Sequence, residues 1–120
     1  MNGKMGKEKY LSLRLGARGR TAHCVRAVLD FGAQRCVISE ALADKLNLVC
    51  RSGYPVVKMY IDGALVSAGS YKHAKLERVY WCPQEIEGVD VTIMGGLSVD
   101  MVITGDTYNK LCARQINHVE

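Results

Sequence analysis

The chain has 120 residues, of which 48% are hydrophobic, and its formal net charge at pH 7 is +4. This length corresponds to one domain that can bury a core without a disulfide or metal staple, and the composition excludes a disordered chain. No apolar run approaches the roughly 20 residues that a membrane-spanning helix needs, and residues 1–9 lack the apolar stretch of a secretory signal. We therefore expect a cytoplasmic protein with no membrane partner.

The cysteines agree with a reducing compartment. Their number is odd, and no two of them have the spacing of a zinc knuckle or a redox pair. We expect free thiols, no metal site and no cofactor. The five cysteines are Cys24, Cys36, Cys50, Cys82 and Cys112.

The positive charge is concentrated at the N-terminus. Up to Arg20 there are six basic residues and one acidic residue, Glu8, whereas the remainder is nearly neutral. We interpret residues 1–9 as a flexible, solvated basic arm that precedes one domain at residues 10–115. The alternative is a small RNA-binding protein that uses this arm, but a nucleic-acid partner is not our expectation.

The first elements of the domain are two predicted strands. Leu11, Leu13 and Leu15 alternate with polar residues, which is typical of a strand with one buried face. A turn is predicted at residues 16–20, and residues 24–29 read as a second strand that enters the core. Cys24 is expected to pack there as a small hydrophobic residue rather than to act as a nucleophile.

One short helix and several further strands follow. Ser39 is a suitable N-cap, with Glu40 in the first turn and apolar positions that continue to Leu46. Asp62-Gly63 is a strong hairpin signal between two strand patterns. Together these patterns predict a small closed all-β barrel with one short α-helix. The remaining predicted strands are residues 36–38, 56–61, 64–68, 75–81, 89–94 and 99–103.

Asp30 is the residue that most needs an explanation. It follows a run of core-strand residues directly, where a carboxylate is costly unless it is hydrogen-bonded, paired or at the strand end. Gly32 and Ala33 then allow the backbone to turn tightly around it. On composition alone, a turn-forming aspartate that ends a strand is the simpler interpretation.

The longer segment around Asp30 changes this balance. Residues 27–48, with Asp30-Phe31-Gly32-Ala33, an apolar strand and a helix that ends in Leu46-Asn47-Leu48, resemble the active-site region of retropepsin-like aspartic peptidases. The resemblance is greatest to those encoded by Pao/BEL-type LTR retrotransposons. Residues 100–108, an apolar run with Gly105 and Asp106, are similar to a second landmark of that family.

The resemblance implies a homodimeric aspartic endopeptidase of retrotransposon origin. Each subunit would supply Asp30 as its catalytic residue, and the two carboxylates would share one proton and activate a water. Gly32 and Ala33 would contact a peptide or polyprotein substrate, and the hairpin at Asp62-Gly63 would cover it as a flap. No metal or other cofactor is implied.

Two residues depart from the family pattern. Phe31 stands where the family has Thr or Ser, whose hydroxyl holds the two aspartates in register across the dimer axis. At the second landmark, either Asp106 matches the family's acid and Thr104 stands where a glycine is expected, or Gly105 is the matching glycine and the spacing is one residue short. Small misplacements at an active site are costly, so we expect Phe31 to attenuate activity. The alternative is a catalytically inactive dimerisation or peptide-binding module with the same fold.

Overall fold

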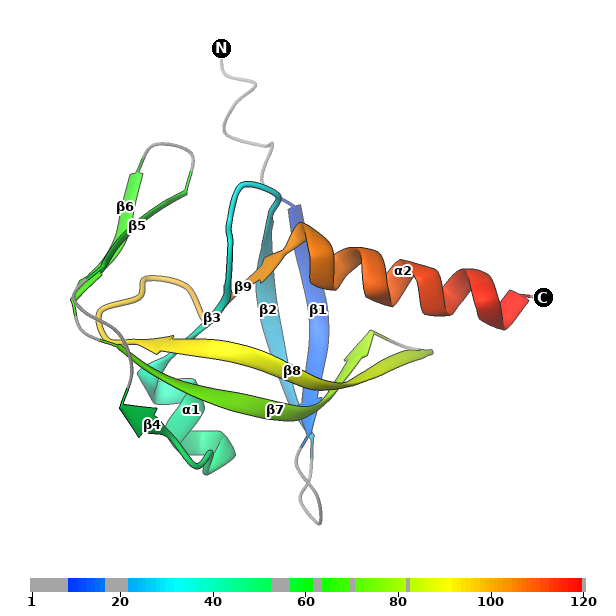
Figure 1. Cartoon of the computed structure of the whole chain (residues 1–120), viewed down its shortest axis with the longest axis horizontal. Coiled ribbons are helices and arrows are strands. Elements are labelled where there is room, and N and C mark those ends of the chain that lie inside the picture. The colour runs from blue at the N-terminus through cyan, green and yellow to red at the C-terminus, as the bar shows by residue number, and fades with distance from the viewer. Residues whose placement is uncertain are drawn as a thin grey trace.

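The computed structural model describes residues 9–16, 22–52, 57–61, 64–69, 71–81 and 83–119. The basic arm before Lys9, the predicted turn after Gly16, the Asp62-Gly63 pair and Cys82 lie outside the described residues. The described elements are arranged around one barrel (Figure 1). They are β1 (Lys9–Gly16), β2 (His23–Asp30), β3 (Cys36–Ser39), α1 (Glu40–Leu46), β4 (Arg51–Ser52), β5 (Val57–Ile61), β6 (Ala64–Gly69), β7 (Tyr71–Trp81), β8 (Gln84–Met94), β9 (Met101–Thr104) and α2 (Gly105–Val119).

The barrel is a sheet that closes on itself. Its strand order is β1-β2-β9-β3-β8-β7-β4, and β1 also pairs with β7, which joins the two sides. The antiparallel ladder of β7 and β8 forms one wall, from Tyr71 opposite Met94 to Trp81 opposite Gln84. Strand β9 lies between β2, to which it is parallel, and β3, to which it is antiparallel. The closed, mostly-β architecture predicted from the sequence is therefore confirmed.

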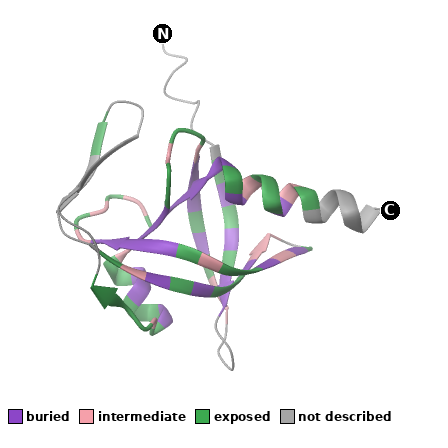
Figure 2. Cartoon of the chain, in the orientation of Figure 1, coloured by how far each residue is buried: buried purple, intermediate pink, exposed green. Residues whose placement is uncertain are grey.

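The core fills the barrel from alternating strand positions. Leu11, Leu13 and Leu15 of β1 are buried as their spacing predicts, and β9 has no exposed residue (Figure 2). The prediction for Cys24 was wrong, because this residue is exposed. Positions 24 and 26 of β2 point outward and positions 25 and 27 inward, so Cys24 falls on the solvent side of the strand.

Helix α1 begins and ends as its sequence indicates. The Ser39 hydroxyl accepts a hydrogen bond from the Leu42 amide at 3.1 Å, which caps the N-terminus. Asn47 ends the helix in the left-handed conformation, with φ of 59°. Leu42 and Leu46 are buried against the barrel. The short helix and its N-cap are confirmed.

A second and longer helix, α2, follows β9 without a loop and was not predicted from the sequence. Thr104 is its N-cap, because its hydroxyl accepts a hydrogen bond from the Thr107 amide at 3.2 Å. Leu111 anchors the helix in the core, and the helix extends away from the barrel in Figure 1. Neither α1 nor α2, the helices of the described residues, is long and apolar enough to cross a membrane.

The strands β5 and β6 form the predicted hairpin as a separate two-stranded sheet, which stands apart from the barrel in Figure 1.

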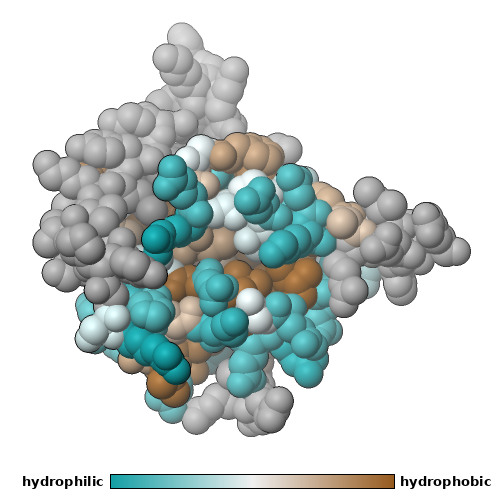
Figure 3. All heavy atoms as spheres, in the orientation of Figure 1, coloured by the Kyte–Doolittle hydropathy of each residue, from teal (hydrophilic) through white to brown (hydrophobic). Residues whose placement is uncertain are grey.

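The surface of the described part is mixed in character. Figure 3 shows hydrophilic residues over most of the viewed face, with a hydrophobic band across its middle. Among the described residues, four large hydrophobic side chains are exposed. They are Tyr10, Phe31, Val49 and Leu65.

Candidate active site

Asp30 is the last residue of β2, and its carboxylate is held by the turn that follows. The Gly32 amide donates a hydrogen bond to Asp30 Oδ1 at 2.9 Å, and the Ala33 amide donates one to the Asp30 carbonyl at 3.1 Å. A Cβ at Gly32 would lie 3.4 Å from the same Oδ1, which is an ordinary van der Waals contact. Asp30 is half-buried, and among the described residues it makes no ion pair.

The two residues predicted to contact substrate differ in exposure. Gly32 is exposed beside the Asp30 carboxylate. Ala33 is half-buried and packs against a small apolar cluster of Val28, Val37, Met94 and Val102. The structure therefore brings Asp30 and Gly32 together directly, whereas Ala33 fixes the turn to the barrel.

A buried polar network lies beside Asp30. Asp30 and Thr104 are partners in the parallel ladder of β2 and β9. The Thr104 hydroxyl lies 3.2 Å from the Thr107 hydroxyl, which in turn lies 3.2 Å from Cys36 Sγ. Since all three side chains are buried and bonded to one another, they tie the start of α2 to β3. The Thr104 that departs from the family pattern thus has a structural role as helix cap.

Phe31 turns its ring toward the start of α2. The ring is 66% exposed, yet it lies against Gly105 and meets Tyr108 edge-on, with 6.1 Å between the ring centroids. Tyr108 also packs against Trp81, with 5.6 Å between the two ring centroids. A hydrogen bond with Cys112 raises the pKa of the Tyr108 phenol above its ordinary value, and the nearby thiol charge and desolvation act in the same direction.

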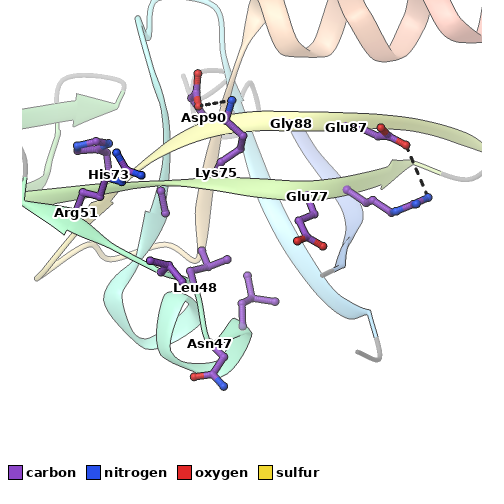
Figure 4. Close-up of a pocket in the computed structure, with 13 residues that line it drawn as sticks. Asn47, Leu48, Arg51, His73, Lys75, Glu77, Glu87, Gly88 and Asp90 are labelled. Atoms are coloured by element: carbon purple, nitrogen blue, oxygen red, sulfur yellow. Dashed lines mark ion pairs between the residues drawn. The ribbon is translucent and has the colours of Figure 1, made fainter. Parts of the chain in front are cut away.

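Two hollows lined by described residues lie away from Asp30. The larger, a groove of about 1060 Å³, is bordered by the end of α1, β4 and the strands β7 and β8 (Figure 4). Its lining is charged, with ion pairs between Lys75 and Asp90 at 3.5 Å and between Arg78 and Glu87 at 3.9 Å. The hydrogen bond with Glu85 raises the pKa of the Arg78 guanidinium. These exposed pairs are typical of a solvated surface rather than of a catalytic site.

The smaller hollow, of about 480 Å³, reaches the Cys36, Thr104 and Thr107 network from the side of β8. Asp30 lines neither hollow. Within the described residues, no group of three or more His, Cys, Asp or Glu side chains could hold a metal ion.

Sequence reasoning placed Gly105, Thr107 and Tyr108 in the second family landmark but missed how they pack beside Asp30. Gly105 and Tyr108 form the surface on which Phe31 lies, and Thr107 bonds to the cap of α2. A signal for the cap was present, because Thr104 is followed by Asp106 in the first turn of the helix. The contact of Phe31 with Gly105 had no local signal, since the two residues are far apart in sequence.

A closed barrel, with an aspartate at the end of a buried strand and held by the turn that follows it, is the fold of the retropepsin-like aspartic proteases. The chain belongs to the aspartyl protease family, whose family model matches residues 17–107.

Solved structures share the fold. The chain is similar to the EIAV protease complexed with the inhibitor HBY-793, with a TM-score of 0.64 at 13% identity over 93% of this chain and 95% of that one. It is also similar to a retropepsin-like aspartic protease from Rickettsia conorii, with a TM-score of 0.58 at 15% identity over 86% of this chain and 78% of that one. No curated protein matches the chain.

Proposed function

We propose that this protein is an aspartic endopeptidase that acts as a homodimer, with Asp30 of each subunit as the catalytic residue. The observation that carries the proposal is the fixed carboxylate, at the end of a buried strand and bonded to the Gly32 amide at 2.9 Å. One chain offers one such aspartate, whereas water activation needs an acid and a base. A second copy of the chain supplies the missing carboxylate.

Two carboxylates that meet at a dimer axis do not both ionise easily, so the pair shares one proton. The ionised member takes a proton from a water, and the protonated member polarises the carbonyl of the peptide bond. Gly32 and Ala33 lie beside this position and contact the peptide. The β5–β6 hairpin covers the peptide as a flap. The substrate class is a peptide or polyprotein in an extended conformation.

We further propose an origin in a Pao/BEL-type retrotransposon polyprotein, which the segment from Ala27 to Leu48 supports through its resemblance to that family. The free thiols of Cys24, Cys36, Cys50 and Cys112 agree with a cytoplasmic location. Phe31 lacks the hydroxyl that holds the two aspartates in register elsewhere in the family, so we expect this protein to have a lower rate than those family members that carry Thr or Ser at this position.

The test is cleavage of a diverse peptide library from acidic to neutral pH by protein whose oligomeric state has been measured by sedimentation. Asp30→Asn is the decisive variant, and Asp44→Asn is its matched control, because Asp44 is an exposed aspartate on α1. Cleavage that is lost in Asp30→Asn and kept in Asp44→Asn supports the proposal. Cleavage that survives Asp30→Asn rejects it.

The second candidate is a catalytically inactive dimerisation or peptide-binding module, and Phe31 is the observation that favours it. Under this alternative, dimeric wild-type protein binds peptides from the library, and neither it nor Asp30→Asn cleaves them. Binding without cleavage therefore decides for the module, whereas turnover that depends on Asp30 decides for the peptidase.

A further inference from the structure

Phe31 is the only phenylalanine of the chain. One edge of its ring packs against Gly105. A Cβ added at Gly105 would fall 2.6 Å from Phe31 Cδ1 and 3.2 Å from Cε1. Non-bonded atoms essentially never approach a Cβ so closely, and therefore no residue larger than glycine fits position 105 while the ring stays in place. The absence of a side chain at Gly105 is what admits the ring of Phe31.

The second contact comes from the next turn of the same helix. Gly105 and Tyr108 are three residues apart in α2 and therefore share a face. Tyr108 meets the Phe31 ring at an interplanar angle of 90°, the edge-to-face geometry that aromatic pairs prefer. Trp81 of β7 packs against the ring of Tyr108. We call Gly105 and Tyr108, supported by Trp81, the aromatic seat of Phe31.

The seat continues the strand pairing at the point where its backbone hydrogen bonds end. The parallel ladder of β2 and β9 runs from Ala27 with Met101 to Asp30 with Thr104. The residues that follow these two strands are Phe31 and Gly105, and the ring of Phe31 makes the contact between them. The turn that holds the Asp30 carboxylate is therefore attached on one side by the ladder and on the other by the aromatic seat.

We propose that Phe31 is a positioning residue, which fixes the Asp30–Gly32 turn on α2 by packing into the aromatic seat. In other members of the family, by the resemblance, a hydroxyl holds the aspartates in register across the dimer axis. In this chain, the contact of Phe31 with Gly105 and Tyr108 within one subunit takes over part of that role. The structural part of the proposal concerns a single subunit, whereas its consequence for turnover rests on the proposed peptidase function. Phe31 and Gly105 are then a matched pair, because the ring needs the space that the glycine leaves.

The first experiment observes the ring directly. Biosynthetic labelling with 4-fluorophenylalanine gives one fluorine resonance, because the chain has one phenylalanine. We expect this resonance to differ from its position in denatured protein and to move toward that position in Gly105→Ala. Gly95→Ala is the control, since a methyl there would meet only Glu40 Oε1 at 3.4 Å. A resonance that Gly105→Ala leaves unmoved overturns the seat.

The second experiment observes the Asp30 turn without any need for activity. The amide of Gly32 donates to Asp30 Oδ1, so its nitrogen and proton chemical shifts report this hydrogen bond, and Asp30→Asn marks the perturbed position. We expect Gly105→Ala, which displaces the ring from a distant point of the sequence, to move the Gly32 resonance toward the perturbed position and Gly95→Ala to leave it in place. A Gly32 resonance that is the same in Gly105→Ala and wild type overturns the positioning role.

Kinetics then test the consequence for turnover. If Phe31 positions the aspartate, Phe31→Thr lowers kcat by roughly tenfold or more with little change in KM, because small displacements of a catalytic group are costly. Phe31→Tyr retains most of the wild-type kcat. A rise in kcat in Phe31→Thr overturns the proposal and identifies Phe31 as a simple loss of the family hydroxyl.

The two proposals fail in different ways. Absence of cleavage in every variant, with the fluorine and Gly32 shifts as expected, rejects the peptidase function and supports the fixed turn. Cleavage that depends on Asp30, with the fluorine and Gly32 resonances both unchanged in Gly105→Ala, supports the peptidase function and rejects the aromatic seat.

Discussion

Replacement of Thr104 by valine should destabilise the protein by about 2 kcal/mol, although the two side chains have nearly the same volume. The Thr104 hydroxyl caps α2 by accepting from the Thr107 amide at 3.2 Å, and loss of a threonine cap typically costs about 1 kcal/mol. The Thr107 hydroxyl also loses one partner in a buried place, at a cost of roughly 1–3 kcal/mol for a group left unsatisfied. Because Cys36 Sγ still lies 3.2 Å from that hydroxyl, we take the lower end of this range.

The assay is urea unfolding followed by the fluorescence of Trp81, which is the only tryptophan of the chain. Protein concentration is held constant, because the stability of a dimer depends on it. Thr104→Ser is the matched control, since it keeps the hydroxyl and should lose much less stability than Thr104→Val. A loss below about 0.5 kcal/mol in Thr104→Val, or equal losses in both variants, would refute the role of the network as a cap.

Three further predictions concern the end of α1, the barrel core and an exposed residue, and the same unfolding assay checks all three. Asn47 ends α1 with φ of 59°, so Asn47→Ala should cost about 1 kcal/mol, whereas Asn47→Gly should be nearly neutral; equal effects would contradict the argument from backbone conformation. Ile38 is fully buried between β8 and β9, and Ile38→Ala should cost about 2–5 kcal/mol. Val49 is 84% exposed, so Val49→Ala should change stability by less than about 0.5 kcal/mol, and a larger loss there would show a contact that burial does not record.

Much of the barrel could be predicted because its signals are local. The alternation of Leu11, Leu13 and Leu15 reflects one strand with one buried face, and the cap of α1 is encoded within a few residues of Ser39. The Asp30 turn could also be predicted, because an acidic residue that follows a buried strand and precedes Gly32 has few structural explanations. These features depend on periods and turns that short stretches of sequence contain.

Helix α2 was missed because its first turns are poor in strong helix formers. Gly105, Thr107, Tyr108 and Asn109 all have weaker helix propensity than alanine or leucine. The cap at Thr104 and the packing of Leu111 in the core compensate for this, and both depend on the position of β9 in the barrel. Tertiary packing therefore decides the conformation of this segment.

The exposure of Cys24 and the contact of Phe31 with Gly105 could not be predicted for related reasons. An apolar strand pattern does not say which face is covered, and in β2 the position of Cys24 faces solvent. Gly105 meets Phe31 only because β9 pairs in parallel with β2, and pairing between distant segments leaves no periodic mark in the sequence. The surroundings of the Asp30 turn are thus a property of topology more than of local sequence.

The place of β9 between β2 and β3 also determines when the site can form. Strands β2 and β3 follow each other in the chain and flank the Asp30 turn, yet they have no ladder in common, because β9 separates them. On a ribosome, the chain emerges from the N-terminus, and both flanking strands are made long before their shared partner. Until residues 101–104 have been synthesised, the turn lacks its neighbouring strand, its polar network and its aromatic contact. Assembly of the site therefore has to wait for residues 101–104, whatever the order in which the earlier strands pair.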